Sequence, residues 1–215
     1  MILVIDTSGP VCAAGIFDAG SNTLVASISE TLGKGHAERL IPMIDEVLTQ
    51  AGMTLQQMTR IAVTVGPGSF TGIRVGVAAA RGFALSLGIP AIGVTTLEVV
   101  AEQALEIGPP APVVAAIDAR RDEIFAQVFA PDGEALTEPE AYNYDDIRAI
   151  VARFDGILTG SGAAALNGVT HDVDVYPLGR IGRIGARLPD DTKANPVYIR
   201  GAGAKPQTGF AIKHV

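Results

Sequence analysis

The chain has almost no cysteine and no uninterrupted apolar run. Among its 215 residues the single cysteine, Cys12, lies in an apolar stretch without a disulfide partner. A disulfide framework is therefore excluded, and a reducing compartment suits such a chain. The longest apolar-looking stretch, 75–94, is interrupted by Arg81 and Pro90, which argues against a membrane span. Because the start reaches Asp6 without the basic and apolar regions of a signal peptide, we expect a cytosolic protein with no membrane contact.

Basic residues are also few. The 16 Lys and Arg residues face 23 Asp and Glu residues, so the formal net charge is −7. A field of this sign repels polyanions, which argues against this chain gripping RNA or DNA by itself. If nucleic acid is involved, a basic partner must hold it.

Signatures of catalysis are missing as well. The histidines His36, His171 and His214 are far apart, whereas metal sites need ligands at spacings such as His-x-x-x-His. The segment 66–72 lacks the lysine of a P-loop, and Ser69 stands outside a Gly-x-Ser-x-Gly elbow. We therefore predict no metal site and no catalytic residue in this chain.

What the first half does contain is a clear alternation of strands and helices. A short apolar run opens the chain as a buried strand, and a second strand follows across a Thr-Ser-Gly-Pro turn. Apolar residues then recur at helical spacing from Ala37 to Leu48, until Gly52 ends the pattern. The predicted strands are 1–5, 12–17, 24–29, 60–65 and 90–94, and the predicted helices are 37–48, about 72–87 and 95–107.

The same order begins again after a stiff Gly-Pro-Pro-Ala-Pro connector, 108–112. Asp6 is followed eleven positions later by Phe17, and Asp118 is followed in the same way by Phe129. We place a first lobe at 1–107, a smaller second lobe at 113–200 and a frayed tail at 201–215. The second lobe contains predicted strands 113–118, 123–129 and 156–159, a turn at 131–133, a helix at 145–154 and a short ordered element at 195–200.

A repeated β-β-β-α-β-α unit predicts two related α/β lobes with a cleft between them, where ligands usually bind. The pattern resembles the superfamily of actin, hexokinase and heat-shock-chaperone ATPases, with its ribonuclease H-like lobes. In that superfamily the turn after the first strand carries an Asp and small hydroxyl residues that face nucleotide phosphates. Here Asp6, Thr7 and Ser8 occupy that turn.

Two interpretations of this turn stay open. Its carboxylate and hydroxyl groups suit a phosphate and its cation, and together with Gly66 and Gly68 they make a candidate vestigial phosphate- or nucleotide-binding site. The same residues also suit a turn that only stabilises a hairpin. The matching turn of the second lobe, 118–122, carries two arginines, which argues against phosphoryl transfer.

The glycine-rich segment 66–72 leads into a helix with one face of small residues. It is typical of a tight turn in which Ser69 or Thr71 caps the following helix, although backbone N–H groups there also suit an anion. Small residues recur at every fourth position of the helix, so another helix can approach that face closely. Internal packing and an external interface are both compatible with this pattern. The candidate partner interface comprises Leu40, Ile44, Gly72, Ile73, Gly76, Ala80 and Ala84.

Four segments together resemble the TsaB (YeaZ) family, whose members are needed to make threonylcarbamoyladenosine in bacterial tRNA. They are Ile2 to Ser8, the run Gly-Pro-Gly-Ser-Phe-Thr-Gly-Ile-Arg-Val-Gly over 66–76, Ala-Ala-Ile-Asp-Ala-Arg over 115–120 and Pro-Val-Tyr-Ile-Arg over 196–200. The likeness covers nearly the whole chain, and the glycine-rich run is its most specific part.

The resemblance implies an actin-like two-lobed fold and a non-catalytic role. It implies a catalytic paralogue, TsaD, whose metal-binding histidines correspond to positions near Thr96 and Val100 here, and neither side chain replaces an imidazole. It also implies a complex with a TsaE-like ATPase, contact with tRNA only through that complex, and a homodimer when the chain is alone. ATP is used by the complex, and this chain requires no cofactor.

Substitution of Gly76 by a bulky residue is expected, on this interface hypothesis, to leave folding largely intact and abolish partner binding. The alternatives are an active ATPase or kinase of the same fold, a peptidase-like hydrolase, and an interaction module unrelated to tRNA.

Overall fold

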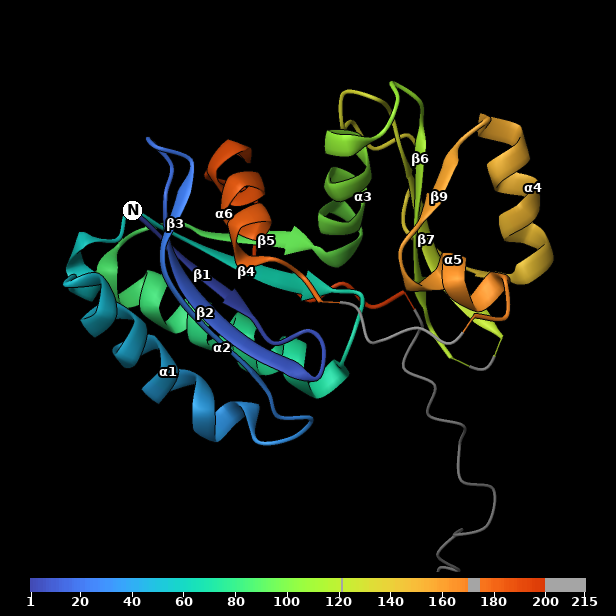
Figure 1. The fold of residues 1–215 in the computed structure, drawn as a ribbon. Helices are drawn as coiled ribbons and strands as arrows, with labels where there is room; N and C mark the ends of the chain where they lie inside the picture. Colours follow the sequence, from blue (N-terminus) through green and yellow to red (C-terminus); the bar gives the residue numbers. More distant parts are fainter. Residues whose placement is uncertain (121, 170–174, 200–215) are drawn as a thin grey trace, which may run out of the picture.

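The fold consists of two sheets with helices packed around them. The structure is a computed structural model, and it describes residues 1–120, 122–169 and 175–199. Figure 1 shows the two sheets side by side, with helix α3 between them. The expected tail, 201–215, lies outside the described residues, as do Arg121 and Arg200.

The first sheet has five strands in the order β3-β2-β1-β4-β5. Strand β1 (Ile2–Asp6) is fully buried, and it pairs antiparallel with β2 (Val11–Asp18) and parallel with β4 (Arg60–Gly66). Its continuous apolar sequence suits a central strand that is covered on both faces. The edges are formed by β3 (Thr23–Thr31) and β5 (Ala91–Thr95).

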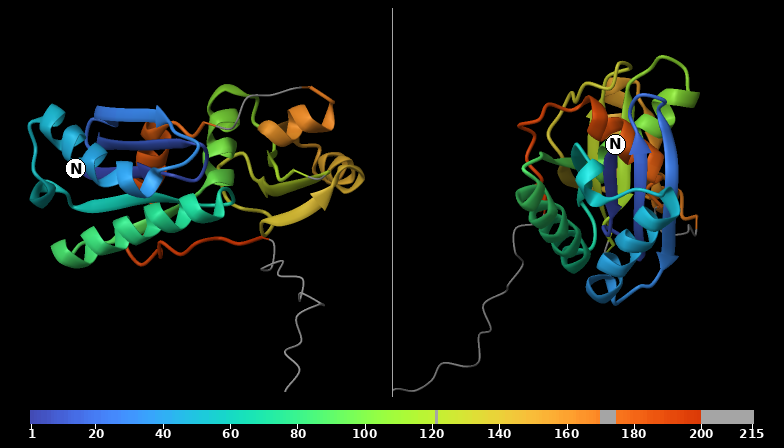
Figure 2. Two further views of the ribbon diagram at one scale, coloured as in Figure 1. Left: turned by 90° about the horizontal axis from the view of Figure 1, so that it is seen from below. Right: turned by 90° about the vertical axis from the view of Figure 1, so that its left-hand side faces the viewer.

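Helices α1 (His36–Ala51) and α2 (Phe70–Leu87) lie together on one face of this sheet, as Figures 1 and 2 show. A short 3-10 turn, η1 (Leu55–Gln57), leads from α1 to β4. The apolar stripe of α1 is buried in the core against α2 and the sheet. Gly52 ends α1 in the left-handed region, where its N–H group bonds to the carbonyl of Leu48.

Of the described helices, α2 is long and apolar enough to cross a membrane by length and composition alone, and a third of it is buried. One side of α2 packs against β4 and β1. That side holds Gly72, Ile73, Gly76 and Val77, all of them buried, so α2 forms part of the lobe's own core.

The second sheet repeats the first with one strand fewer. Its order, β8-β7-β6-β9, corresponds to β3-β2-β1-β4, and β6 again pairs antiparallel with the next strand and parallel with the last. The predicted two-lobed α/β fold is therefore confirmed. The elements are β6 (Val113–Asp118), β7 (Glu123–Phe129), β8 (Glu140–Asn143), α4 (Tyr144–Phe154), β9 (Ile157–Thr159) and α5 (Ser161–Leu166).

The last helix of each half crosses to the other half. Helix α3 (Thr96–Ile107) follows β5 and packs mainly against β6, whereas α6 (Leu178–Arg187) packs against β1, β2 and β4. The predicted division into 1–107 and 113–200 therefore does not describe α6, which covers the first sheet. The segment after α6 stays with that sheet, since Ala194 is in its core and the N–H of Val197 bonds to the carbonyl of Val65.

Two features of the sequence explain why α6 lies there. Glycines at 182 and 185 bring its backbone against Phe17 and Ala62, where a Cβ atom would collide with their side chains. Arg60 then donates to the carbonyls of Gly185 and Leu188 at 2.6 and 2.8 Å, which satisfies the end of the helix.

The structure places none of the seven residues of the predicted partner interface on the surface of the lobe. Each of them is buried inside the first lobe, with Leu40, Ile73 and Ala80 at most 1% exposed. The small face of α2 is turned inward, because a Cβ atom on Gly72 or Gly76 would meet the main chain or the hydroxyl of Thr7. The close approach that the spacing predicts is thus made to the β1–β2 turn within the same chain.

Gly76 and Gly82 of α2 differ in their surroundings, and substituting each by alanine tests the inward packing of the small-residue face. Gly76→Ala is expected to destabilise the protein by about 1–3 kcal/mol, since the added methyl group overpacks the contact with Thr7, Val63 and Ile5. Gly82→Ala, with no heavy atom within 4 Å of the new Cβ, is expected to stabilise it by up to about 1 kcal/mol through helix propensity. Urea unfolding of both variants measures the difference, and equal effects would contradict this packing.

Candidate functional site between the lobes

A cleft of about 600 Å³ lies between the lobes and is the candidate functional site. It is lined by the β1–β2 turn and the loop before α2 from the first lobe, and by the β6–β7 turn from the second. Residues 197–199, near the end of the described chain, complete its wall. Its size is in the range of small-molecule pockets.

The carboxylate of Asp6 lies beneath this cleft, and one of its oxygens is bonded within its own lobe. One oxygen accepts hydrogen bonds from the Ser8 N–H at 2.9 Å, the Ser8 hydroxyl at 2.6 Å and the Thr64 hydroxyl at 2.7 Å. Burial raises the pKa of Asp6, and these three bonds oppose that shift. The carboxylate therefore acts as an internal acceptor that fixes the turn.

The loop before α2 closes over the same turn. The hydroxyl of Thr7 donates to the carbonyl of Gly72 at 2.7 Å, and the N–H of Ser69 donates to the carbonyl of Ser8 at 2.6 Å. Gly68 permits this approach, because a Cβ atom there would overlap the Ser8 carbonyl. Gly66, with φ of 99°, needs a backbone conformation that suits glycine.

The structure thus brings the five predicted phosphate-site residues together, but the side chains of Asp6, Thr7 and Ser8 form hydrogen bonds within the first lobe. Asp6 and Thr7 are 2% and 0% exposed, and neither lines the cleft. Ser8 and Gly68 do line it, beside Ser69, whose side chain caps α2 by accepting from the Gly72 N–H at 3.2 Å. This geometry favours the hairpin-stabilising interpretation of the turn over phosphate binding.

The matching turn of the second lobe is more open. Asp118 accepts a hydrogen bond from the Arg120 N–H at 2.8 Å, and the Arg120 side chain is 76% exposed. Arg120 has a φ of 63° and lines the cleft together with Asp118. A cationic side chain therefore stands where the first lobe has only small residues.

A cluster of Phe70, Arg74 and Tyr198 at the cleft was not predicted from the sequence. The Arg74 guanidinium lies 3.8 Å from the centre of the Phe70 ring, and its Nε donates to the Tyr198 hydroxyl at 2.9 Å. Two of the segments that carry the family resemblance meet here, 66–76 and 196–200. Their aromatic and arginine residues are visible in the sequence, but nothing in the pattern indicates that they touch.

No group of three or more metal-binding side chains occurs among the described residues. Thr96, near one of the positions that the resemblance assigns to a histidine of the paralogue, is buried and donates to the carbonyl of Pro67 at 2.7 Å. Val100, near the other, lies in the apolar core. His36 is held by the Gly9 carbonyl at 3.1 Å.

The family model described as "TsaD: tRNA N6-adenosine threonylcarbamoyltransferase" matches residues 26–175. The chain is also 41% identical over 128 residues to the tRNA threonylcarbamoyladenosine biosynthesis protein TsaB of Haemophilus influenzae, and 35% identical over 139 residues to that of Escherichia coli. The chain belongs to the TsaB (YeaZ) family.

These alignments cover 59% and 65% of this chain, and they span 53% and 59% of the two TsaB proteins. A solved structure, YeaZ from Pseudomonas aeruginosa, superposes with a TM-score of 0.73 at 27% identity, over 92% of this chain and 98% of the other. The two-lobed arrangement is therefore that of a YeaZ fold.

Substitutions at Asp6 test its role as an internal acceptor. Asp6→Ala is expected to destabilise the protein by about 2–4 kcal/mol, since it leaves the buried Ser8 and Thr64 donors unsatisfied. Asp6→Asn keeps an acceptor oxygen and is expected to cost less. Denaturant unfolding near pH 4 and pH 7 is the measurement.

The pH dependence has a defined sign. Because the folded pKa of Asp6 lies above its usual 3.8, the favourable contribution is complete below that value and is lost as pH rises through the folded pKa. Wild type is therefore expected to lose stability relative to Asp6→Asn as pH rises from about 4. A difference that grows in the opposite direction would contradict a desolvated carboxylate.

Proposed function

We propose that this chain is a non-catalytic accessory subunit of the bacterial complex that transfers threonylcarbamoyl to the adenosine beside the anticodon of tRNA. It binds a TsaD-like catalytic subunit in the cytoplasm, and a TsaE-like ATPase joins them. The complex uses ATP, whereas this chain requires no cofactor of its own. Membership of the TsaB family is the observation that carries this proposal.

The hydrogen bonding of the cleft supports a non-catalytic role. A kinase or ATPase of this fold needs a carboxylate at the first turn that is free to orient a cation or water. Asp6 is instead 2% exposed and bonded within its lobe. A peptidase-like hydrolase needs an activated nucleophile, and the nearby Ser69 hydroxyl caps α2.

The outer faces of α1 and α2 are the better candidates for the partner interface. Ile41 on α1 is 50% exposed and Leu85 on α2 is 87% exposed, and both helices lie on the open side of the first sheet. Apolar side chains on the exposed faces of adjacent helices are typical of a subunit interface.

The charge of α2 indicates what kind of surface fits there. The second half of the helix carries Arg81 and no acidic residue, on a chain of net charge −7. Near its end, Arg81 and Lys193 line an apolar groove with Leu85. In the part of the chain that the structure describes, no ion pair involves either cation. An apolar partner helix edged by carboxylates complements this surface.

Leu85→Asp tests this interface. The variant is expected to fold normally, because the side chain is exposed, and to weaken the complex with the TsaD-like subunit at least tenfold by placing a charge in an apolar contact. Light scattering after size exclusion and calorimetry measure assembly and affinity. The matched control is Leu136→Asp, on an exposed leucine of the second lobe.

A one-to-one complex with wild type and with the control, but not with Leu85→Asp, is the expected result. The same surface serves the homodimer that the chain forms alone, so that dimer is expected to weaken too. Undiminished assembly by Leu85→Asp would contradict the interface, and no complex with wild type would contradict the proposed function.

A further inference from the structure

The cluster of Phe70, Arg74 and Tyr198 presents aromatic rings at the surface of the cleft. Phe70 is 52% exposed and Tyr198 is 45% exposed, and their ring centroids are 5.3 Å apart at an angle of 42°. Both rings line the cleft. Aromatic residues make up only 5% of this sequence. Two half-exposed rings in contact at a cleft are therefore unusual in this chain, and they offer a surface on which a planar ligand can stack.

The cluster is held in place by structure on both sides. Phe70 is the first residue of α2, directly after the capping Ser69. Tyr198 follows Val197, whose N–H bonds to the Val65 carbonyl at 2.8 Å. Arg74 joins the two, because it stacks on Phe70 and donates to the Tyr198 hydroxyl. The rings are therefore pre-organised, which lowers the entropic cost of stacking a ligand on them.

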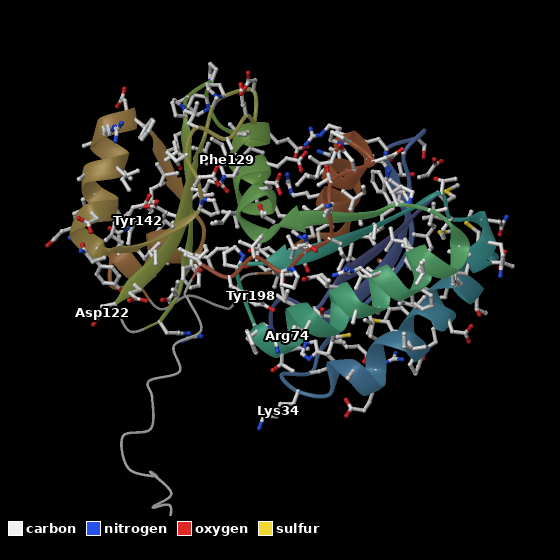
Figure 3. All side chains as sticks on the ribbon, turned by 180° about the vertical axis from the view of Figure 1, so that it is seen from behind. Lys34, Arg74, Asp122, Phe129, Tyr142 and Tyr198 are labelled. Atoms are coloured by element: carbon white, nitrogen blue, oxygen red, sulfur yellow. The ribbon has the colours of Figure 1, made fainter. Side chains whose placement is uncertain are left out.

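The charges around the rings favour a planar ligand that carries negative charge. Arg74 has aromatic partners and no carboxylate partner in the described residues. Arg120 lines the same cleft. Asp118 is the acidic residue among the described lining residues, and it lies within 4.0 Å of Arg120. Figure 3 shows Arg74 and Tyr198 adjacent to each other at the junction of the two lobes.

We propose that Phe70, Arg74 and Tyr198 form a stacking platform for an unpaired base of the RNA that the complex binds. A nucleobase offers a π-face to the rings, and the neighbouring phosphates suit the cations at the cleft. Because the chain as a whole repels polyanions, a basic partner provides the electrostatic binding of the RNA, and the platform contributes base stacking. This inference rests on the proposed function.

The test uses the complex of this chain with its TsaD-like partner, and an anticodon stem-loop RNA labelled with fluorescein. The double substitution Phe70→Leu with Tyr198→Leu removes both rings and keeps apolar bulk. Loss of one stacked base is expected to weaken RNA binding by about 5- to 150-fold in fluorescence anisotropy. The control is Leu136→Ala, an exposed apolar site away from the cleft.

Salt distinguishes stacking from an electrostatic effect. The double variant is expected to lose the same factor at about 50 mM and about 200 mM salt, because stacking releases no counterions. Unlabelled 5′-AMP is added as a competitor, and it is expected to displace the RNA only weakly.

Three results would overturn the platform. RNA affinity that is unchanged in the double variant excludes a stacking role. Displacement by 5′-AMP as effective as that by unlabelled RNA assigns the rings to a free nucleotide. Loss of the complex itself in light scattering assigns them to a protein contact. If wild type forms no complex, the proposed function fails first, whereas an intact complex with unchanged RNA binding refutes the platform alone.

Discussion

The first lobe depends on one close contact, in which the β1–β2 turn packs directly against the glycines at the start of α2. Gly68 and Gly72 make room for the main chain of the turn, and Gly76 makes room for the side chain of Thr7. The hydroxyl of Thr7 bonds to the carbonyl of Gly72. Asp6 then accepts hydrogen bonds from Ser8 and Thr64, whose donor groups this burial would otherwise leave unsatisfied. In this chain the turn thus belongs to the core of the lobe, although it has the position of a phosphate-binding turn.

The two lobes are joined by an exchange of helices. Helix α3 covers the second sheet and α6 covers the first, and arginines of α6 bond to Glu102 and Glu106 of α3. Each half of the sequence therefore completes the core of the other. The cleft is left between loops that face each other, and its wall carries the aromatic side chains of Phe70 and Tyr198 and the cationic side chain of Arg120.

Local patterns predicted most of the fold, but they did not predict which surfaces meet. The apolar runs and the helical spacing of 37–48 located the strands and helices of the first half, and the repeat located β6, β7 and α4. The spacing of Gly72, Gly76, Ala80 and Ala84 revealed a face made for close approach. The spacing alone does not indicate whether that face packs inside the lobe or lies on its surface. In this structure it packs inside, together with the buried Ile73 and Val77.

The elements that were missed have weak local signals. Strand β8 is short and mostly exposed, and α6 is rich in glycine and arginine, so its fit depends on Phe17, Ala62 and Arg60 far away in the sequence. The contact between Arg74 and Tyr198 joins residues 124 positions apart. Its parts were visible in two motifs, but only the packing of the C-terminal segment on the first sheet brings them together.

In the proposed function, this chain supports a reaction whose chemistry lies in another subunit. The most direct measurement is tRNA modification and ATP hydrolysis by the purified chain alone and by the reconstituted complex, each with wild type and with Asp6→Asn. We expect no turnover by the chain alone, and equal rates for the two complexes. ATP hydrolysis by the chain alone that disappears in Asp6→Asn would contradict the proposed function.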